Sequence, residues 1–207
     1  MQNTKWKEDW QTIQSLHGRK RLDHIWTYYK IPIILVLIVV YMAAYIGYRQ
    51  ATRKENVLYL ALVNVSAGQD LTEDLTTGFL EQQGLSSEKQ QVYFYNGLLL
   101  SEDADPQYAY ASRMKIMGAL AADQLDVVLM DQEARDAFVQ EEYLADLRTL
   151  DPSLTREEGL DESGLWMDVS SSPLLEAAGF SDRVYLGVIR ESPNPDRAAA
   201  FIHYLMS

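Results

Sequence analysis

The feature that most constrains this chain is an uninterrupted apolar run at residues 31–48, which contains no formally charged side chain. As an α-helix, a run of this length covers roughly 27 Å, and the hydrocarbon core of a bilayer is about 30 Å thick. Trp26 precedes the run, and Tyr45 and Tyr48 end it, as expected for aromatic side chains at membrane interfaces. The run therefore predicts a transmembrane helix with Pro32 in its first turn, where the missing N–H costs least.

Two other interpretations of this run are a cleaved signal peptide and a buried core helix. A signal peptide has a short N-terminal region, a shorter apolar run and small residues at its cleavage site. Here thirty residues come first, and the bulky Tyr45 and Ile46 follow the small pair Ala43 and Ala44. These features favour an uncleaved transmembrane span.

Charge changes sign along the chain. Residues 1–54 hold nine basic and three acidic residues (net +6), whereas residues 55–207 hold nine and 27 (net -18), which gives the chain its net charge of -12. Nucleic acid is excluded as a main partner, because phosphate binding needs clustered Lys and Arg. The sequence has no Cys, which excludes disulfides, thiolate metal sites and a Cys nucleophile.

The apolar run and the break in charge predict four segments. They are a cytoplasmic basic juxtamembrane segment at residues 1–30, a transmembrane helix at 31–48, a linker at 49–55 and a folded domain at 56–207. Four Lys and Arg flank the run on its N-terminal side and three on its C-terminal side, which favours a cytoplasmic N-terminus. We expect a single-pass protein of the cell membrane with its acidic domain outside the cytoplasm.

The juxtamembrane segment allows two interpretations. Apolar residues recur at helical spacing near Lys5 and Lys7, namely Trp6, Trp10, Ile13 and Leu16. An amphipathic helix on an anionic inner leaflet would explain this pattern. A frayed tail with a few aromatic residues would explain it equally well.

The acidic portion alternates strand and helix patterns. Strands are predicted at residues 56–65, 91–95 and 125–130, and helices at 71–84, 105–124 and 131–140. Asp70 is the predicted N-cap of the first helix, with Glu73 as its capping-box partner. A looser stretch follows, and it ends in a strand at 183–190 and a helix at 195–206. The pattern predicts an α/β fold, with an open, doubly wound, mostly parallel sheet of about five strands and helices on both faces.

Three stretches of the acidic portion carry a resemblance to a known family. They are NVLYLALVN, LAADQLDVVLMDQEARDAFVQEEYLADLRTL and VYLGVIRESPNPDRAAAFIHYLMS, which cover about half of residues 55–207. They resemble the extracellular solute-binding proteins of bacterial ABC importers, which have the two-lobed type II periplasmic-binding fold. The stretch DHIWTYYKIPIIL is similar to membrane anchors from anaerobic Gram-positive bacteria. About fifty residues separate the third strand from the returning strand, too few for a second lobe, so the resemblance implies a single lobe.

Three polar residues are candidates for ligand binding. Asn64, Asn96 and Asp131 fall at the predicted carboxyl ends of three parallel strands, where open α/β sheets bind ligands. The alternative is that these side chains form Asx-turns and a helix N-cap.

Residues that could perform catalysis or hold a metal occur singly or out of pattern. Ser86 and Lys89 formally match SxxK, but no companion motif accompanies them. Glu102, Asp103 and Asp105 lack the order of a calcium-binding loop and are predicted to cap the next helix. His203 is the sole His of the acidic portion and is predicted to be a surface or half-buried residue of the last helix. No catalytic residue, metal ligand or cofactor is assigned.

The sequence predicts a membrane-anchored, non-catalytic domain that acts as an interaction, sensor or transporter-accessory module. Its partners would be the lipid bilayer and either membrane transporter subunits or other copies of the chain. The alternative is a small-solute binding module completed by dimerisation or by a partner subunit. A lone lobe has no second lobe to close over a ligand, although small-molecule sites bury 70–90% of a ligand's surface.

Overall fold

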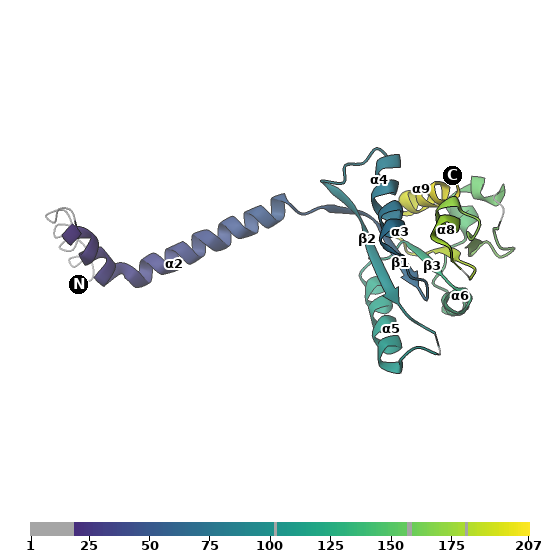
Figure 1. Cartoon of the computed structure of the whole chain (residues 1–207), viewed down its shortest axis with the longest axis horizontal. Coiled ribbons are helices and arrows are strands. Elements are labelled where there is room, and N and C mark those ends of the chain that lie inside the picture. Colours follow the sequence, from purple (N-terminus) through teal and green to yellow (C-terminus); the bar gives the residue numbers. More distant parts are fainter. Residues whose placement is uncertain (1–18, 102, 157–158, 181) are drawn as a thin grey trace. The chain divides into compact units, whose positions relative to one another are not determined.

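The computed structural model describes residues 19–101, 103–156, 159–180 and 182–207 (Figure 1). The chain divides into two compact units between Arg53 and Lys54. The predicted amphipathic segment at residues 1–16 lies outside the described residues.

The first unit contains one long helix, α2 (Arg19–Ala51). Its segment Lys30–Gln50 is long and apolar enough to cross a bilayer, and none of it is buried against the rest of the chain. Membrane anchors and signal sequences share these properties.

The predicted position of Pro32 in the first turn of a helix is wrong. Helix α2 begins at Arg19, so Pro32 lies in its interior, where it removes one backbone hydrogen bond. Figure 1 shows α2 changing direction in its N-terminal part, as an internal proline causes. The helix also ends later than predicted, at Ala51, and leaves residues 52–54 before the first strand.

The second unit is an α/β domain built on an open sheet of five strands. They are β1 (Glu55–Val63), β2 (Gln90–Leu98), β3 (Val127–Met130), β4 (Met167–Asp168) and β5 (Tyr185–Val188), in the order β2-β1-β3-β5-β4. Strand β1 pairs in parallel with β2 and β3, whereas β5 is antiparallel to both β3 and β4. Four strands therefore run in one direction and β5 in the other, which confirms the predicted α/β class and the mostly parallel sheet.

The predicted helix at residues 71–84 is present but begins earlier. It consists of α3 (Gln69–Glu73), a π-helical turn η1 (Asp74–Gly78) and α4 (Phe79–Gln82). The predicted capping box is wrong, because Gly68 is the N-cap residue and no side chain caps it. Asp70 instead lies in the first turn, where a carboxylate still interacts favourably with the positive end of the helix dipole.

The remaining helices follow the predicted order. They are α5 (Pro106–Ala121), α6 (Gln132–Gln140), α7 (Leu147–Leu150), the 3₁₀ helix η2 (Pro152–Arg156), α8 (Pro173–Ala178) and α9 (Pro195–Met206). Asp105 caps α5 by accepting hydrogen bonds from the N–H groups of Gln107 and Tyr108, and Pro106 is the first helical residue, as predicted.

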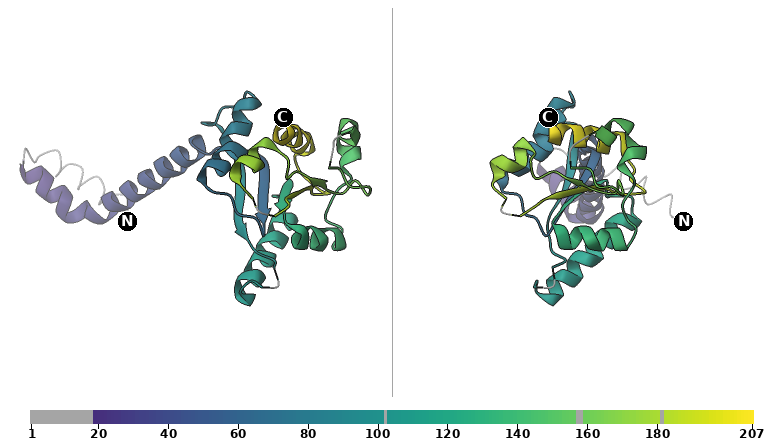
Figure 2. Two further views of the ribbon diagram at one scale, coloured as in Figure 1. Left: turned by 45° about the vertical axis from the view of Figure 1, so that its right-hand side comes forward. Right: turned by 90° about the vertical axis from the view of Figure 1, so that its right-hand side faces the viewer.

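Alternate residues of the central strands enter two separate hydrophobic clusters. Leu60 and Leu62 pack with Phe79 and Phe201, while Ala61 and Val63 belong to a second cluster with α5 and α6 side chains. Since successive strand residues point to opposite faces, each face of the sheet carries one cluster. Figure 2 shows α9 and α6 on opposite sides of the sheet.

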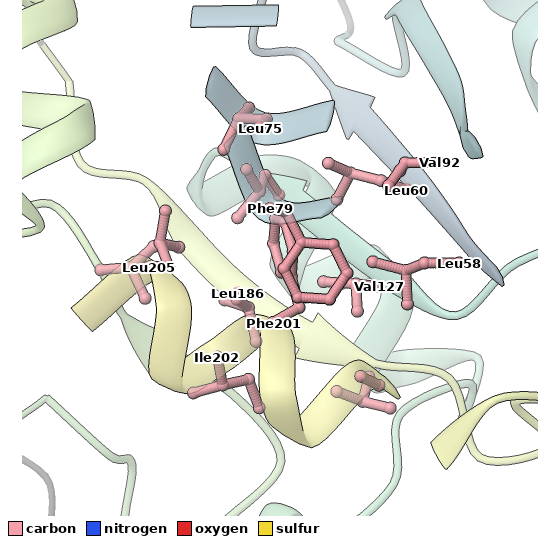
Figure 3. Close-up of a cluster of buried hydrophobic side chains, with 14 of the residues drawn as sticks. Leu58, Leu60, Leu75, Phe79, Val92, Val127, Leu186, Phe201, Ile202 and Leu205 are labelled. Atoms are coloured by element: carbon pink, nitrogen blue, oxygen red, sulfur yellow. The ribbon is translucent and has the colours of Figure 1, made fainter. Parts of the chain in front are cut away.

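The first cluster is centred on two phenylalanines (Figure 3). The rings of Phe79 and Phe201 are fully buried and meet edge to face with centroids 5.2 Å apart. Burying a side chain of this size contributes about 1.5–3 kcal/mol relative to leaving it exposed. These contacts tie α4 and α9 to the same face of the sheet.

Candidate functional site

The strand order places a crevice at the carboxyl ends of β1 and β3. Strand β1 has β2 on one side and β3 on the other. The segment from β1 to β2 packs through Phe79 on one face, and α5, which leads from β2 to β3, packs through Ile116 on the other. Phe79 and Ile116 therefore pack on different faces of the sheet, and open α/β sheets bind ligands outside the carboxyl ends of their strands.

Two of the predicted candidates meet at this crevice. Val63 and Met130, the last residues of β1 and β3, are neighbours in the sheet, and Asn64 and Asp131 follow them directly. The side-chain amide of Asn64 donates a hydrogen bond of 3.0 Å to Oδ1 of Asp131.

Asn64 connects the end of β1 to the segment after β2 through hydrogen bonds. Its Oδ1 accepts hydrogen bonds from the backbone N–H groups of Leu100 at 2.6 Å and Ser101 at 3.2 Å. Its backbone has φ +58°, in the left-handed region that Asn tolerates better than most residues. The side chain therefore has a structural role whether or not a ligand binds.

Asp131 is the N-cap residue of α6. Its Oδ1 accepts the backbone N–H of Ala134 at 2.8 Å in addition to the amide of Asn64. Its Oδ2 makes no hydrogen bond to any residue that the structure describes. One carboxylate oxygen thus holds the local structure together while the other is free to meet a ligand.

The third candidate, Asn96, does not join the pair. Strand β2 extends to Leu98, so Asn96 lies inside the strand and not after its end. Its side chain is exposed, donates to the carbonyl of Ala67 at 3.2 Å and accepts the N–H of Gly97 at 2.9 Å.

A cavity of about 520 Å³ lies beside the Asn64–Asp131 pair. Its other polar walls come from the loop after β1 and from the start of β5, and they include Ser66, Asp182, Arg183 and Tyr185. These four residues were not predicted as site residues. Arg183 opens the predicted strand at 183–190, and it reaches this edge because β5 is antiparallel to β3, so that the start of β5 lies beside the end of β3.

The cavity wall carries charges of both signs. The guanidinium of Arg183 is 3.6 Å from Oδ2 of Asp168, and its side chain is 75% exposed. An exposed ion pair of this kind contributes about 0–1 kcal/mol, so Arg183 can exchange Asp168 for a ligand at little cost. Together with the carboxylate of Asp131, the wall offers an acceptor and a cationic donor to a small polar molecule.

Tyr185 links this cavity to a layer of stacked side chains. Its ring meets Trp166 edge to face with centroids 5.0 Å apart. The guanidinium of Arg135 lies over both rings, 4.6 Å from the centroid of Trp166 and 4.4 Å from that of Tyr185. The indole of Trp166 therefore contacts a residue of the cavity wall.

His203 has polar neighbours, but their geometry differs from that of a catalytic triad. Its Nε2 is 2.9 Å from Oδ2 of Asp151 and 3.4 Å from Oγ of Ser153. A triad histidine holds its carboxylate on one ring nitrogen and its nucleophile on the other. Here Asp151 and Ser153 both contact Nε2. The histidine therefore cannot accept a proton from the serine on one nitrogen while the carboxylate orients it through the other. The His203 side chain lies at the surface, as predicted, with 44% exposed.

The other patterns singled out in the sequence have structural roles where the structure describes them. Ser86 and Lys89 belong to a turn in which the carbonyl of Ser86 accepts the N–H of Lys89. Asp105 caps α5, and Glu102 lies outside the described residues. Within the described ranges no group of three or more His, Asp or Glu side chains is placed to hold a metal ion.

A scan against protein-family models, a search of curated proteins and a search of solved structures each found no match. Function therefore has to follow from the residues and the geometry themselves.

Proposed function

We propose that this chain is a single-pass membrane protein whose second unit lies outside the cytoplasm and works as a non-catalytic interaction, sensor or transporter-accessory domain. The observation that carries the proposal is helix α2, whose segment Lys30–Gln50 is apolar and has no part buried against the rest of the chain. Exposing such a helix to water is unfavourable, whereas a bilayer accommodates it.

The fold of the second unit supports its derivation from one lobe of a solute-binding protein. We take the sheet to be doubly wound, because the connections from β1 to β2 and from β2 to β3 pack on opposite faces. The crevice then corresponds to the surface on which a second lobe would close. No described part of this domain closes over the crevice, so we take the surface to be left for a partner.

The alternative function is small-solute binding, and the cavity beside Asp131 favours it. Its volume of about 520 Å³ falls within the range of about 300–1,000 Å³ that small-molecule sites occupy. A second subunit would have to supply the missing wall, because the cavity opens to solvent.

Membrane anchoring is tested on the full chain by extraction with alkaline carbonate. We expect it to stay in the membrane fraction, and a variant with Leu37→Arg and Val40→Arg to be released, since each Arg costs about 2.5–3.5 kcal/mol at the centre of a span. Orientation is tested with Ser87→Cys, an exposed turn position in a chain with no native Cys. Labelling of intact cells by an impermeant maleimide is expected. Release of the native chain, or labelling only after lysis, would contradict the proposal.

Solute binding is tested on residues 54–207, a compact unit with its own core. Trp166 is the single Trp of this unit and contacts Tyr185, so its fluorescence reports on the cavity. The domain is screened against sugars, amino acids, peptides and divalent cations by fluorescence and thermal shift. A specific ligand at about a hundred times its Kd should stabilise the domain by roughly 2.7 kcal/mol.

The variants for this screen must separate binding from folding. Asp131→Asn keeps an N-cap acceptor and removes the charge, and Arg183→Gln removes the exposed cation. Arg190→Gln, at the other end of β5, is the matched control. A ligand response that Arg183→Gln removes and Arg190→Gln retains supports solute binding. No response to any compound leaves the interaction module as the function.

A further inference from the structure

Helix α5 is apolar on two opposite sides. Ile116 and Ala119 are buried against the sheet. On the outward side Tyr110 is 68% exposed and Met114 and Met117 are each 49% exposed. Large apolar side chains that gather on the exposed side of a helix mark an interaction surface, so the outward side of α5 indicates a surface that something covers.

The outward residues form one stripe along the helix. Tyr110, Met114, Met117 and Ala121 follow one another at spacings of three or four residues, which places them on one face, and we call them the α5 stripe. Methionine suits such a contact, because its flexible side chain adapts to the shape of a partner surface.

Two hollows lie next to the C-terminal part of the α5 stripe. They have volumes of about 400 and 350 Å³, and both are lined by Met117 and Tyr143. Apolar side chains line each of them, including Leu125 and Ile189 in the first and Leu100 and Phe138 in the second. The surface therefore has protruding apolar side chains beside recesses that are lined by both apolar and charged residues.

The stripe is complementary to itself when two copies meet in opposite directions. Its N-terminal half is bulky, with Tyr110 and Met114, while its C-terminal half ends in Ala121 beside Gly118. The space where a Cβ of Gly118 would lie has no atom within 4 Å. An antiparallel pairing with Met114 opposite Met117 places each Tyr110 opposite the small Ala121 of the other copy.

Charge favours the same direction. Arg113 lines the second hollow and makes no ion pair with any described residue. Asp123 and Glu191 line the first hollow, near the C-terminal end of α5. Antiparallel helices bring Arg113 of each copy toward these carboxylates of the other, whereas parallel helices would bring Arg113 against Arg113.

We propose that the α5 stripe and its two hollows form an interface between two copies of this chain, related by a two-fold axis with their α5 helices antiparallel. A two-fold interface uses the same patch on both partners, which is what a self-complementary stripe provides. The stripe and the hollows together form the surface through which the domain binds a second copy of itself.

The size of the stripe links this interface to the membrane. A 16-residue helix is about 24 Å long and about 10–12 Å across, so the stripe itself covers a few hundred Å². Stable interfaces bury about 800 Å² per partner, so the stripe by itself makes a weak contact in solution. Tethering both copies to one bilayer raises their effective concentration and favours pairing. To this extent the interface rests on the proposed membrane anchor.

The interface is tested by cysteine cross-linking of the full chain in membranes, where the absence of native Cys makes every disulfide traceable. Two differently tagged copies are co-expressed, one with Tyr110→Cys and the other with Ala121→Cys, and a mild oxidant is added. We expect a disulfide-linked heterodimer. Tyr110→Cys in both copies should give none, because the two Cys would lie about 16 Å apart along the helix, and disulfides need Cα atoms within about 7 Å. The matched control replaces Tyr110→Cys by Ala111→Cys, which is exposed on the same helix but lies off the stripe, and it should give less cross-linking with Ala121→Cys.

Three outcomes would overturn the proposal. Cross-linking of Tyr110→Cys to itself would show parallel helices, and equal cross-linking at Ala111→Cys would show random collision. Cross-linking to a different protein without any dimer would assign the stripe to another partner. A second measurement avoids cysteine: co-precipitation of the two tagged copies should be lost with Met114→Lys and Met117→Lys together, and kept with Ala111→Lys. Thermal melts of each variant show whether it folds, and carbonate extraction of the same membranes tests the anchor separately.

Discussion

The amide of Asn64 and the carboxylate of Asp131 join the carboxyl ends of β1 and β3 through one hydrogen bond of 3.0 Å, although the residues lie 67 positions apart in the sequence. The same oxygen of Asp131 caps α6, and Asn64 also holds the backbone at Leu100 and Ser101. The polar groups of the crevice therefore support the fold directly. A substitution here that abolishes ligand binding is informative only when its effect on stability is known.

We predict that Asn64→Ala destabilises residues 54–207 by about 2–4 kcal/mol. It removes two acceptor bonds and one donor bond, and it places an Ala at φ +58°, which costs roughly 1 kcal/mol. Asn64→Gly loses the same bonds without that steric cost, so it should be the less destabilising of the two. Urea unfolding of both variants measures the difference. Equal losses would mean that the left-handed backbone contributes nothing.

We predict a larger loss of stability at Asp126, a fully buried carboxylate with no cationic partner among the residues that the structure describes. Its oxygens accept hydrogen bonds from the backbone of Tyr59, from the hydroxyl of Ser192 and from the backbone and side chain of Asn194. Asp126→Ala removes the acceptor of four hydrogen bonds from partly buried donors. Each such bond contributes about 0.5–1.5 kcal/mol, so we expect a loss of about 3 kcal/mol or more.

Chemical unfolding of residues 54–207 tests this role of Asp126. Glu191→Gln, an exposed position in the same part of the chain, serves as the control and should change stability by less than about 0.5 kcal/mol. A loss at Asp126→Ala no larger than that of the control would show that the four hydrogen bonds add nothing to stability.

Local patterns in the sequence were sufficient for most elements of the domain. Helix α9 has the predicted bounds because Pro195 fits the first turn and the apolar spacing continues to Met206. Helix α5 begins where Asp105 and Pro106 predict, since both residues act within one turn of the helix start. Such signals depend on neighbours in sequence and can be recognised without the fold.

Features that depend on distant contacts were not predictable in this way. The four residues of β5 are all buried, and a buried run carries no information about strand direction, yet the antiparallel direction is what brings Arg183 to the crevice. Asp126 was included in a predicted strand, and its burial depends on donors 66–68 residues away. Asn96 was assigned to a strand end because the polar residues of β2 hide the true length of that strand.

We predict that Arg135→Lys destabilises the domain by about 1 kcal/mol and changes the emission of Trp166. The planar guanidinium of Arg135 stacks over Trp166 and Tyr185 and donates two hydrogen bonds to Oδ1 of Asp136. A lysine ammonium keeps the charge but loses the planar stacking. Fluorescence-detected urea unfolding measures both effects, with Arg190→Lys as the control. Unchanged emission and stability would mean that charge alone accounts for the contact.

The last prediction concerns acid stability and the contact between Asp151 and His203. The hydrogen bond from His203, supported by bonds from Ser153, lowers the pKa of Asp151 from 3.8 to about 2. Because the folded state holds this carboxylate ionised more strongly than the unfolded chain does, the contact stabilises the domain fully above about pH 4. That contribution should disappear as the pH falls from about 4 to 2. We therefore expect wild type to be more stable than Asp151→Asn at pH 5 and the two to converge near pH 2.

The difference in unfolding free energy between the two proteins at pH 5 should also shrink in 1 M salt, where the screening length is about 3 Å, because both side chains are partly exposed. A difference that is independent of pH would mean that the charge on Asp151 is not what stabilises this contact.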